Sequence, residues 1–314
     1  TGAAFALFRK ASLRVGYILD DIKRSGRAFS DMTDYTYRVS LDTYGNQYLK
    51  LRGVYENTSR IGTGFSEAAI EDGGAQGGLR FFDEADMDRQ KGSLVLQVTP
   101  NGTMDLGFTL AAGKDIYKGE GHEFGLLSNR NTSYNATLTV YPTDRITTGG
   151  NYGYETFKSL QKSRNANPLS GVPGAYESFI DPNRIWNLDN DETVKNLGLF
   201  LDLLQALPNT DIRFSYDNSN SDNAFVHSGP RIQELLTNTA LTAGDVKPCA
   251  TGLTSCFEAL PNVTNTWKQM RIDVKHMFSP KVGVGVGYWY EKFDIVDFAT
   301  TDLADGSPRI DPLG

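Results

Sequence analysis

The chain has 314 residues, a formal net charge of −7, 39% hydrophobic residues and 32 glycines. The acidic balance argues against a nucleic-acid partner, which needs a basic surface, and no run of about 18 apolar residues is present to form a transmembrane helix. Two cysteines and the lack of a Cys-x-x-Cys-His sequence exclude a zinc ribbon, an iron–sulfur site and covalently attached haem in this chain.

An apolar face that alternates with a polar face predicts β-strands along most of the chain. In the last strand Val284 and Tyr288 fall on one face, while Gly285 and Glu291 fall on the other. Residues 191–206 alternate least, so a helix is the alternative there. In chain order, the predicted strands cover residues 3–8, 11–21, 31–43, 46–60, 88–99, 103–117, 127–141, 145–160, 191–206, 210–219, 265–278 and 281–296.

The connections between these strands alternate strictly between short and long. The short ones carry turn-forming residues, as in Pro100-Asn101-Gly102. The long ones are polar and cover residues 61–87, 118–126, 161–190 and 220–264. Outer-membrane barrels show this order, because one rim has tight periplasmic turns and the other has long extracellular loops.

Tyrosines gather on the apolar face toward the long-loop end of the strands, where an interfacial aromatic girdle belongs. Strands of about ten residues span a bilayer, and the sheet must close because lipid satisfies no backbone groups. A soluble β-sandwich or propeller with these side chains in its core is the alternative. The tyrosines are Tyr17, Tyr35, Tyr37, Tyr55, Tyr152, Tyr154, Tyr216, Tyr288 and Tyr290.

The pattern therefore predicts an all-β protein, an antiparallel up-and-down transmembrane β-barrel in the bacterial outer membrane. Residues 1–314 are expected to form a single barrel domain with about 11–12 strands. Single-chain bacterial barrels have an even number of strands, and no closing strand follows Phe298. We therefore expect a segment of a larger barrel that lacks the N-terminal part and the closing strand.

The polar face of the strands is expected to line the lumen. It carries charges of both signs, so no single-sign selectivity filter is predicted. Contact with a partner inside the barrel is one interpretation, and a solvated lumen with cross-strand ion pairs is the other. Part of this face carries no side chains, because Gly283, Gly285 and Gly287 lie on it. The glycines either permit close approach by a molecule in the lumen or relieve strain in curved strands. The candidate contact residues are Arg14, Arg38, Lys50, Arg52, Arg213, Arg271, Asp273, Lys275 and Glu291.

No catalytic, cofactor-binding or metal site is predicted, and we expect a protein that is not an enzyme. Cys249 and Cys256 lie in the loop 220–264 and are expected to form a disulfide, with a redox or metal pair as the alternative. His122 and His227 lie in predicted loops. His276 lies on the apolar face, which disfavours a Ser-His-acid triad in the barrel.

Several stretches resemble the MtrB/PioB family of decahaem-cytochrome-associated outer-membrane barrels. They are Tyr-Thr-Tyr-Arg-Val-Ser-Leu-Asp at 35–42, Phe-Asp-Glu-Ala-Asp-Met-Asp-Arg at 82–89, residues 287–299, and Pro-Arg-Ile-Asp-Pro-Leu-Gly at 308–314. A recurring Thr/Ser-Pro turn, followed by an alternating strand that ends in Tyr-x-Tyr-Glu, is also similar to this family.

The resemblance implies a non-catalytic sheath that houses a periplasmic multihaem c-type cytochrome and supports electron transfer across the outer membrane. Haem would belong to that partner alone, and an extracellular cytochrome would dock at the long loops. The alternative is a porin or transporter for small solutes, in which an inward-folded constriction loop is expected.

Overall fold

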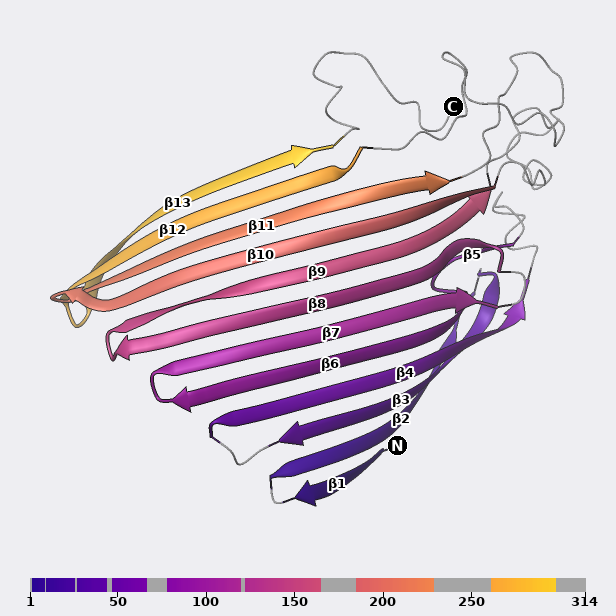
Figure 1. The fold of residues 1–314 in the computed structure, drawn as a ribbon, viewed down its shortest axis with the longest axis horizontal. Coiled ribbons are helices and arrows are strands. Elements are labelled where there is room, and N and C mark those ends of the chain that lie inside the picture. Colours follow the sequence, from indigo (N-terminus) through magenta and orange to yellow (C-terminus); the bar gives the residue numbers. More distant parts are fainter. Residues whose placement is uncertain are drawn as a thin grey trace, which may run out of the picture.

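A computed structural model describes residues 2–8, 10–25, 27–43, 47–66, 78–119, 122–164, 185–228 and 261–297. These residues form one curved antiparallel sheet with short turns at one end and the long connections at the other (Figure 1). Neighbours in the sheet are also neighbours in sequence, with β5 off the main path. This is the up-and-down arrangement of a transmembrane barrel wall.

The strands follow the predicted order closely. They are β1 (Gly2–Phe8), β2 (Ala11–Lys23), β3 (Phe29–Thr43), β4 (Leu49–Phe65), β5 (Leu79–Arg80), β6 (Asp86–Asn101), β7 (Met104–Lys118), β8 (Phe124–Thr143), β9 (Ile146–Arg164), β10 (Ile185–Leu207), β11 (Thr210–Ser228), β12 (Val263–Ser279) and β13 (Val282–Val296).

The predicted strands are confirmed, and the helical alternative for residues 191–206 is wrong. That segment lies within β10, which pairs along its length with β9 and β11. A strand places Leu197, Leu199, Leu201 and Leu203 on one face. Phe200 and Leu204 fall at positions of the other face, which weakens the alternation in the sequence. Among the described residues, no helix is long and apolar enough to cross a membrane.

Several strands extend further toward the long-loop end than the sequence predicts. β11 runs to Ser228 rather than residue 219, and β10 begins at Ile185 rather than residue 191. The ladder between them continues to the pair Asn187 and Ser228. Both faces of these extensions mix polar and apolar residues, so the regular apolar alternation that marks a strand is missing although the backbone pairing persists.

The apolar face of the sheet is exposed rather than packed. Val286 is 67% exposed and Tyr37 is 61% exposed, and both lie on the face that the sequence assigns to lipid. Tyr17 packs against Tyr37 with ring centroids 5.1 Å apart. A face of this kind belongs against hydrocarbon, with the tyrosines at the boundary.

Within the described residues the sheet is open, and its edges are β1 and β13. Each edge strand leaves one row of backbone groups without a partner strand. Such edges are not tolerated in lipid, so a complete barrel requires further pairing at both strands.

An arginine on the outer face should impair membrane insertion. Val286→Arg places a charge in the middle of the apolar row of β13, and we expect a loss of about 2–4 kcal/mol at the bilayer midplane. The fraction of heat-modifiable, folded protein in the outer membrane measures this loss.

Gly285→Arg is the matched control, since it adds the same side chain at the neighbouring position on the opposite face. A Cβ at Gly285 meets no atom within 4 Å. Normal assembly of Val286→Arg, or an equal defect in the control, would contradict the assignment of the two faces.

Candidate functional site

The polar face of the sheet is the candidate site, and the strand register shows which side chains share it. Residues paired directly across antiparallel strands point to the same side. Arg38 pairs with Gly16 and Glu56, and Arg213 pairs with Asp202 and Asp273. Following the pairs from strand to strand places all the predicted contact residues on this inner face: Arg14, Arg38, Lys50, Arg52, Arg213, Arg271, Asp273, Lys275 and Glu291.

Ion pairs join many of these charges. Nη1 of Arg38 lies 3.3 Å from Oε1 of Glu56, and Nε of Arg52 lies 3.3 Å from Oδ1 of Asp42. Arg213 donates two hydrogen bonds to Asp202, at 2.7 and 2.9 Å. These cross-strand pairs place charges of both signs side by side on this face. Exposed pairs contribute about 0–1 kcal/mol each, so they orient the charges more than they stabilise the sheet.

On β12 the ion pair runs along one strand instead of across two. Arg271 donates to both carboxylate oxygens of Asp273, at 2.7 and 3.0 Å. Both residues lie on the inner face, as does Trp267, whose Nε1 donates to Oε1 of Glu291 on β13 at 2.5 Å. This part of the wall therefore presents oriented polar groups beside the glycine-rich part of β13.

The sequence analysis missed a tighter ionic network nearer the long loops. Arg60 donates to Asp34 at 2.8 and 3.0 Å, and Arg89 donates to Asp115 at 2.8 and 2.9 Å. The side chains of Arg60 and Asp34 are each only 16% exposed. Bidentate, half-buried pairs fix geometry better than exposed ones. These four charged residues alternate with outward-facing residues along their strands, and this period of two could have identified them as inner-face residues.

A short strand that was not predicted from the sequence, β5, lies between β4 and β6 in the chain. β5 pairs in parallel with Phe124 and Gly125 of β8. A Cβ at Gly125 would lie 2.3 Å from the carbonyl oxygen of Arg80, so only glycine permits this approach. The following turn closes through hydrogen bonds from the amides of Glu84 and Ala85 to the carbonyl oxygen of Phe81, both 2.9 Å.

Residues 78–86, called the inward segment below, pack against the inner face. Met87 is fully buried and clusters with Ala85, Tyr117 and Leu126. Met87 pairs with Arg60 and with Tyr117, which places this cluster on the charged side of the sheet. The inward segment therefore reduces the open width of that face at the long-loop end.

Charged side chains anchor the inward segment to the neighbouring β2–β3 connection. The carboxylate of Asp83 accepts hydrogen bonds from Arg24, at 2.8 Å, and from Arg27. Nε of Arg27 also lies 3.1 Å from the buried carboxylate of Glu84. The guanidinium of Arg80 lies 3.9 Å from the ring centroid of Phe65 in a cation–π contact. Phe65 packs against a second buried cluster, which consists of Ala28, Phe29 and Met32.

The histidines do not assemble into a reactive site. Burial lowers the pKa of His122 in the β7–β8 connection, with the nearby Arg80 charge acting in the same direction. Nδ1 of His276 lies 2.8 Å from the hydroxyl of Thr210, and the ring of His227 stacks on Trp186. No group of three or more metal-ligating side chains occurs in the described residues, and Cys249 and Cys256 lie outside them.

The strand order, the lipid-compatible outer face and the charged inner face together define an outer-membrane β-barrel wall. Residues 1–310 match the family described as outer membrane beta-barrel porin, MtrB/PioB. The chain belongs to this family, and the protein is a component of the bacterial outer membrane. None of the curated proteins compared with the chain matches it.

Solved outer-membrane receptors share the fold. The chain is similar to the ferric-catecholate import receptor Fiu from E. coli K12 in its open form, with a TM-score of 0.53, 12% identity, and coverage of 92% of this chain and 51% of the receptor. It is also similar to the ferric enterobactin receptor PfeA from Pseudomonas aeruginosa, with a TM-score of 0.56, 11% identity, and coverage of 90% and 39%. The chain thus spans about half the length of these receptors or less, and the likeness concerns the fold alone.

Removing the carboxylate of Asp83 should loosen the inward segment without affecting the sheet. Asp83→Asn loses the charge that holds Arg24 and Arg27, and we expect about 1 kcal/mol less resistance to local opening. Amide hydrogen exchange of residues 78–86 measures this change. Asp144→Asn, in a short turn at the opposite rim, is the matched control, and equal exchange in both variants would contradict the anchoring role.

The inward segment should also open more easily at acid pH. The pKa of His122 in the folded state lies below its ordinary value of 6.5, so the opened state binds more protons. The free energy that holds the inward segment against the sheet is therefore at its full value above about pH 6.5, and it falls as the pH drops below that value. Hydrogen exchange at pH 7.5 and pH 5, corrected for its intrinsic pH dependence, should show this in the wild type and less in His122→Gln. An equal pH response in both proteins would rule out His122 as the cause.

Proposed function

We propose that this chain forms part of a non-catalytic barrel that sheathes a periplasmic multihaem c-type cytochrome and so supports electron transfer across the outer membrane. The observation that carries the proposal is the inner face of β12 and β13. It combines oriented ion pairs of both signs, a glycine-rich strip and exposed aromatic rings on one wall.

The aromatic rings favour a protein partner over water alone. Trp289 is 64% exposed and Phe293 is 55% exposed, and both lie on the inner face because they pair with Arg271 and Trp267. Tryptophan and arginine are enriched where protein surfaces meet. In an open aqueous channel these large apolar side chains would face water and would stabilise no contact.

The glycine strip supports the same interpretation. Gly283, Gly285 and Gly287 lie on the inner face beside Lys275 and Asp273. No side chain projects from the sheet at these glycines, so the backbone of a folded partner can approach the strand closely. Charges of both signs complement a mixed protein surface, whereas an ion-selective pore concentrates one sign at a constriction.

In this arrangement the chain supplies insulation and position rather than redox chemistry. Haem would reside in the partner, and none of the residues described here is assigned a catalytic role. The long loops at the outer rim would meet an extracellular cytochrome that receives or supplies the electrons. The direction of electron flow would then depend on the potentials of the partners.

A porin or transporter for small solutes is the second candidate. The inward segment favours it, because a segment folded onto the inner face narrows a channel at one rim. The family description also names a porin. In that case the barrel should conduct small solutes when purified alone.

An absorption spectrum of the protein purified in mild detergent from its native outer membrane tests the proposal. A strong haem Soret band at about one cytochrome per barrel is expected. A colourless barrel that conducts ions in planar bilayers would overturn the sheath and leave the porin.

The contact wall should be required to retain the cytochrome. Trp289→Ala combined with Arg271→Ala removes an exposed ring and its paired cation, and we expect at least a tenfold lower ratio of haem to barrel, because central aromatic and arginine contacts are each worth about 2 kcal/mol or more. The haem absorbance per mole of barrel measures this ratio. Val284→Ala combined with Tyr288→Ala on the outer face is the control, and a ratio unchanged in the inner-face variant would contradict the assignment of this wall.

A further inference from the structure

The outer face carries a row of cations that the sheath role does not explain. Lys114 on β7 pairs directly with Arg130 on β8, and Arg130 pairs directly with Lys158 on β9. Toward the membrane on the same face, the next pair is Thr132 with Thr156, and the pair after it is Tyr134 with Tyr154. All the side chains of the cationic row are exposed.

This row should weaken the sheet. Like charges directly opposite each other on antiparallel strands repel and destabilise the pair. Lys158 forms an ion pair with Asp191 of β10, which neutralises one charge. In the part of the chain that the structure describes, Lys114 and Arg130 form no ion pair. Two adjacent cations are therefore left for a partner outside the protein.

The height of the row matches the phosphate layer of the membrane. The rings of Tyr134 and Tyr154 lie 6.3 Å apart on the outer face, where tyrosines mark the edge of the hydrocarbon. Arg130 and Lys158 lie about 13 Å further along their strands, at about 3.3 Å per residue. With strands tilted by about 45°, they stand roughly 9 Å above the tyrosines, in the headgroup region.

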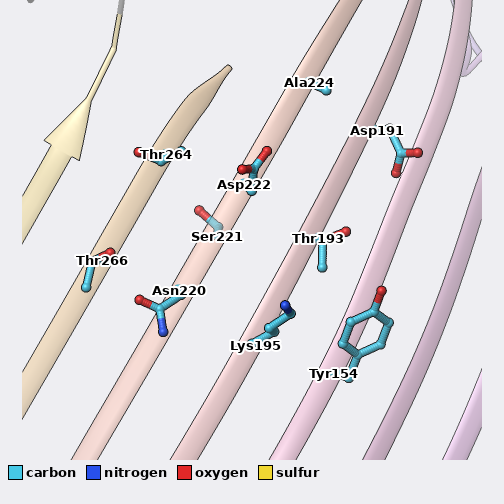
Figure 2. A pocket seen from close by; sticks show the side chains of 10 residues that line it. All are labelled: Tyr154, Asp191, Thr193, Lys195, Asn220, Ser221, Asp222, Ala224, Thr264 and Thr266. Carbon is cyan, nitrogen blue, oxygen red and sulfur yellow. The ribbon is translucent and has the colours of Figure 1, made fainter. Parts of the chain in front are cut away.

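A polar depression lies beside the row on the same face (Figure 2). Asp191, Thr193 and Lys195 come from β10, where Lys195 pairs with Tyr154. Hydroxyl, amide and carboxylate groups of this kind hydrogen-bond to the hydroxyls of sugars. The other residues that line it are Tyr154, Asn220, Ser221, Asp222, Ala224, Thr264 and Thr266.

A second cationic pair stands on the far side of the depression. Lys268 of β12 pairs directly with Lys292 of β13, again next to a tyrosine row, in which Met270 pairs with Tyr290. Lys292 has a carboxylate partner in Asp294. Cations therefore flank the polar depression on both sides at the membrane boundary.

We propose that this outer surface binds a phosphorylated glycolipid of the outer leaflet. Its phosphates would lie against Lys114 and Arg130, beside the Lys158–Asp191 ion pair, and its sugars would lie in the depression between β9 and β12. A phosphate offers the negative charge that the row lacks, and the sugar headgroup matches the polar lining. The proposal concerns the outer face and is independent of what the barrel holds inside.

Lipid binding by a charge-depleted variant tests the proposal. Each basic residue near an anionic lipid surface contributes about fivefold in affinity. Because Asp191 already neutralises Lys158, Lys114→Gln, Arg130→Gln and Lys158→Gln together should weaken binding about 25-fold. The readout is native mass spectrometry and the melting temperature of the detergent-purified protein during titration with purified lipopolysaccharide. Dephosphorylated lipopolysaccharide, phosphatidylglycerol vesicles and inorganic phosphate are titrated in parallel.

The matched control removes the same number of cations elsewhere. Lys91 lies on the inner face, paired with Glu56, and Lys10 and Lys281 lie in short turns. Lys10→Gln, Lys91→Gln and Lys281→Gln together should bind lipopolysaccharide within about twofold of the wild type, since none faces the outer leaflet. If the test variant fails to fold, Arg130→Gln alone should still lose about fivefold.

The outcomes separate the sources of the phosphate. Tight binding of lipopolysaccharide alone, lost in the test variant and kept in the control, supports the glycolipid site. Equal binding by phosphatidylglycerol, an equal shift with inorganic phosphate, or wild-type affinity in the test variant would each overturn it.

Discussion

Every other feature of this wall depends on the backbone hydrogen-bond ladder. Hydrocarbon offers no partners for N–H and C=O groups, so a strand in the membrane must pair on both sides. The ladder connects neighbours in sequence from β1 to β13, with β5 alone off the path. Because directly paired residues point to the same side, the face that a side chain takes on one strand fixes the face of its partner on the next strand. A shift of one residue would turn every side chain to the wrong side.

The ladder divides the side chains between two environments. The outer face exposes apolar side chains such as Val286, which stabilise the wall only in contact with lipid. The inner face has almost no apolar packing of its own, and it satisfies its charges through ion pairs such as Arg213 with Asp202. In the described part of the chain, the small buried clusters lie beside the inward segment. Stability therefore comes from the membrane and the ladder rather than from a core.

Function then depends on what each face meets. On the inner face, β12 and β13 carry aromatic rings and paired charges. The inward segment covers the same face beside β4 to β8, at the long-loop end of the strands. On the outer face, the cations lie on the long-loop side of the pair formed by Tyr134 and Tyr154. The polar extensions of β9 to β12 carry this second surface beyond the hydrocarbon. In the roles that we propose, one sheet would hold a partner on its inner face and select its lipid surroundings on its outer face, because the two surfaces share no side chains.

The sequence by itself determined the strands, their order and their faces, since apolar alternation and turn residues are local signals. It also placed Arg38 and Arg271 on the inner face, because each strand has a strict period of two. Only the tertiary structure decided the strand extensions near Ser228, the inward segment and the rows of cations. The strand extensions lack a regular apolar alternation. β5 forms only because Gly125 lets a segment that is distant in sequence approach β8 closely. The opposition of Lys114, Arg130 and Lys158 depends on register across three strands, which pairing fixes and sequence spacing does not reveal.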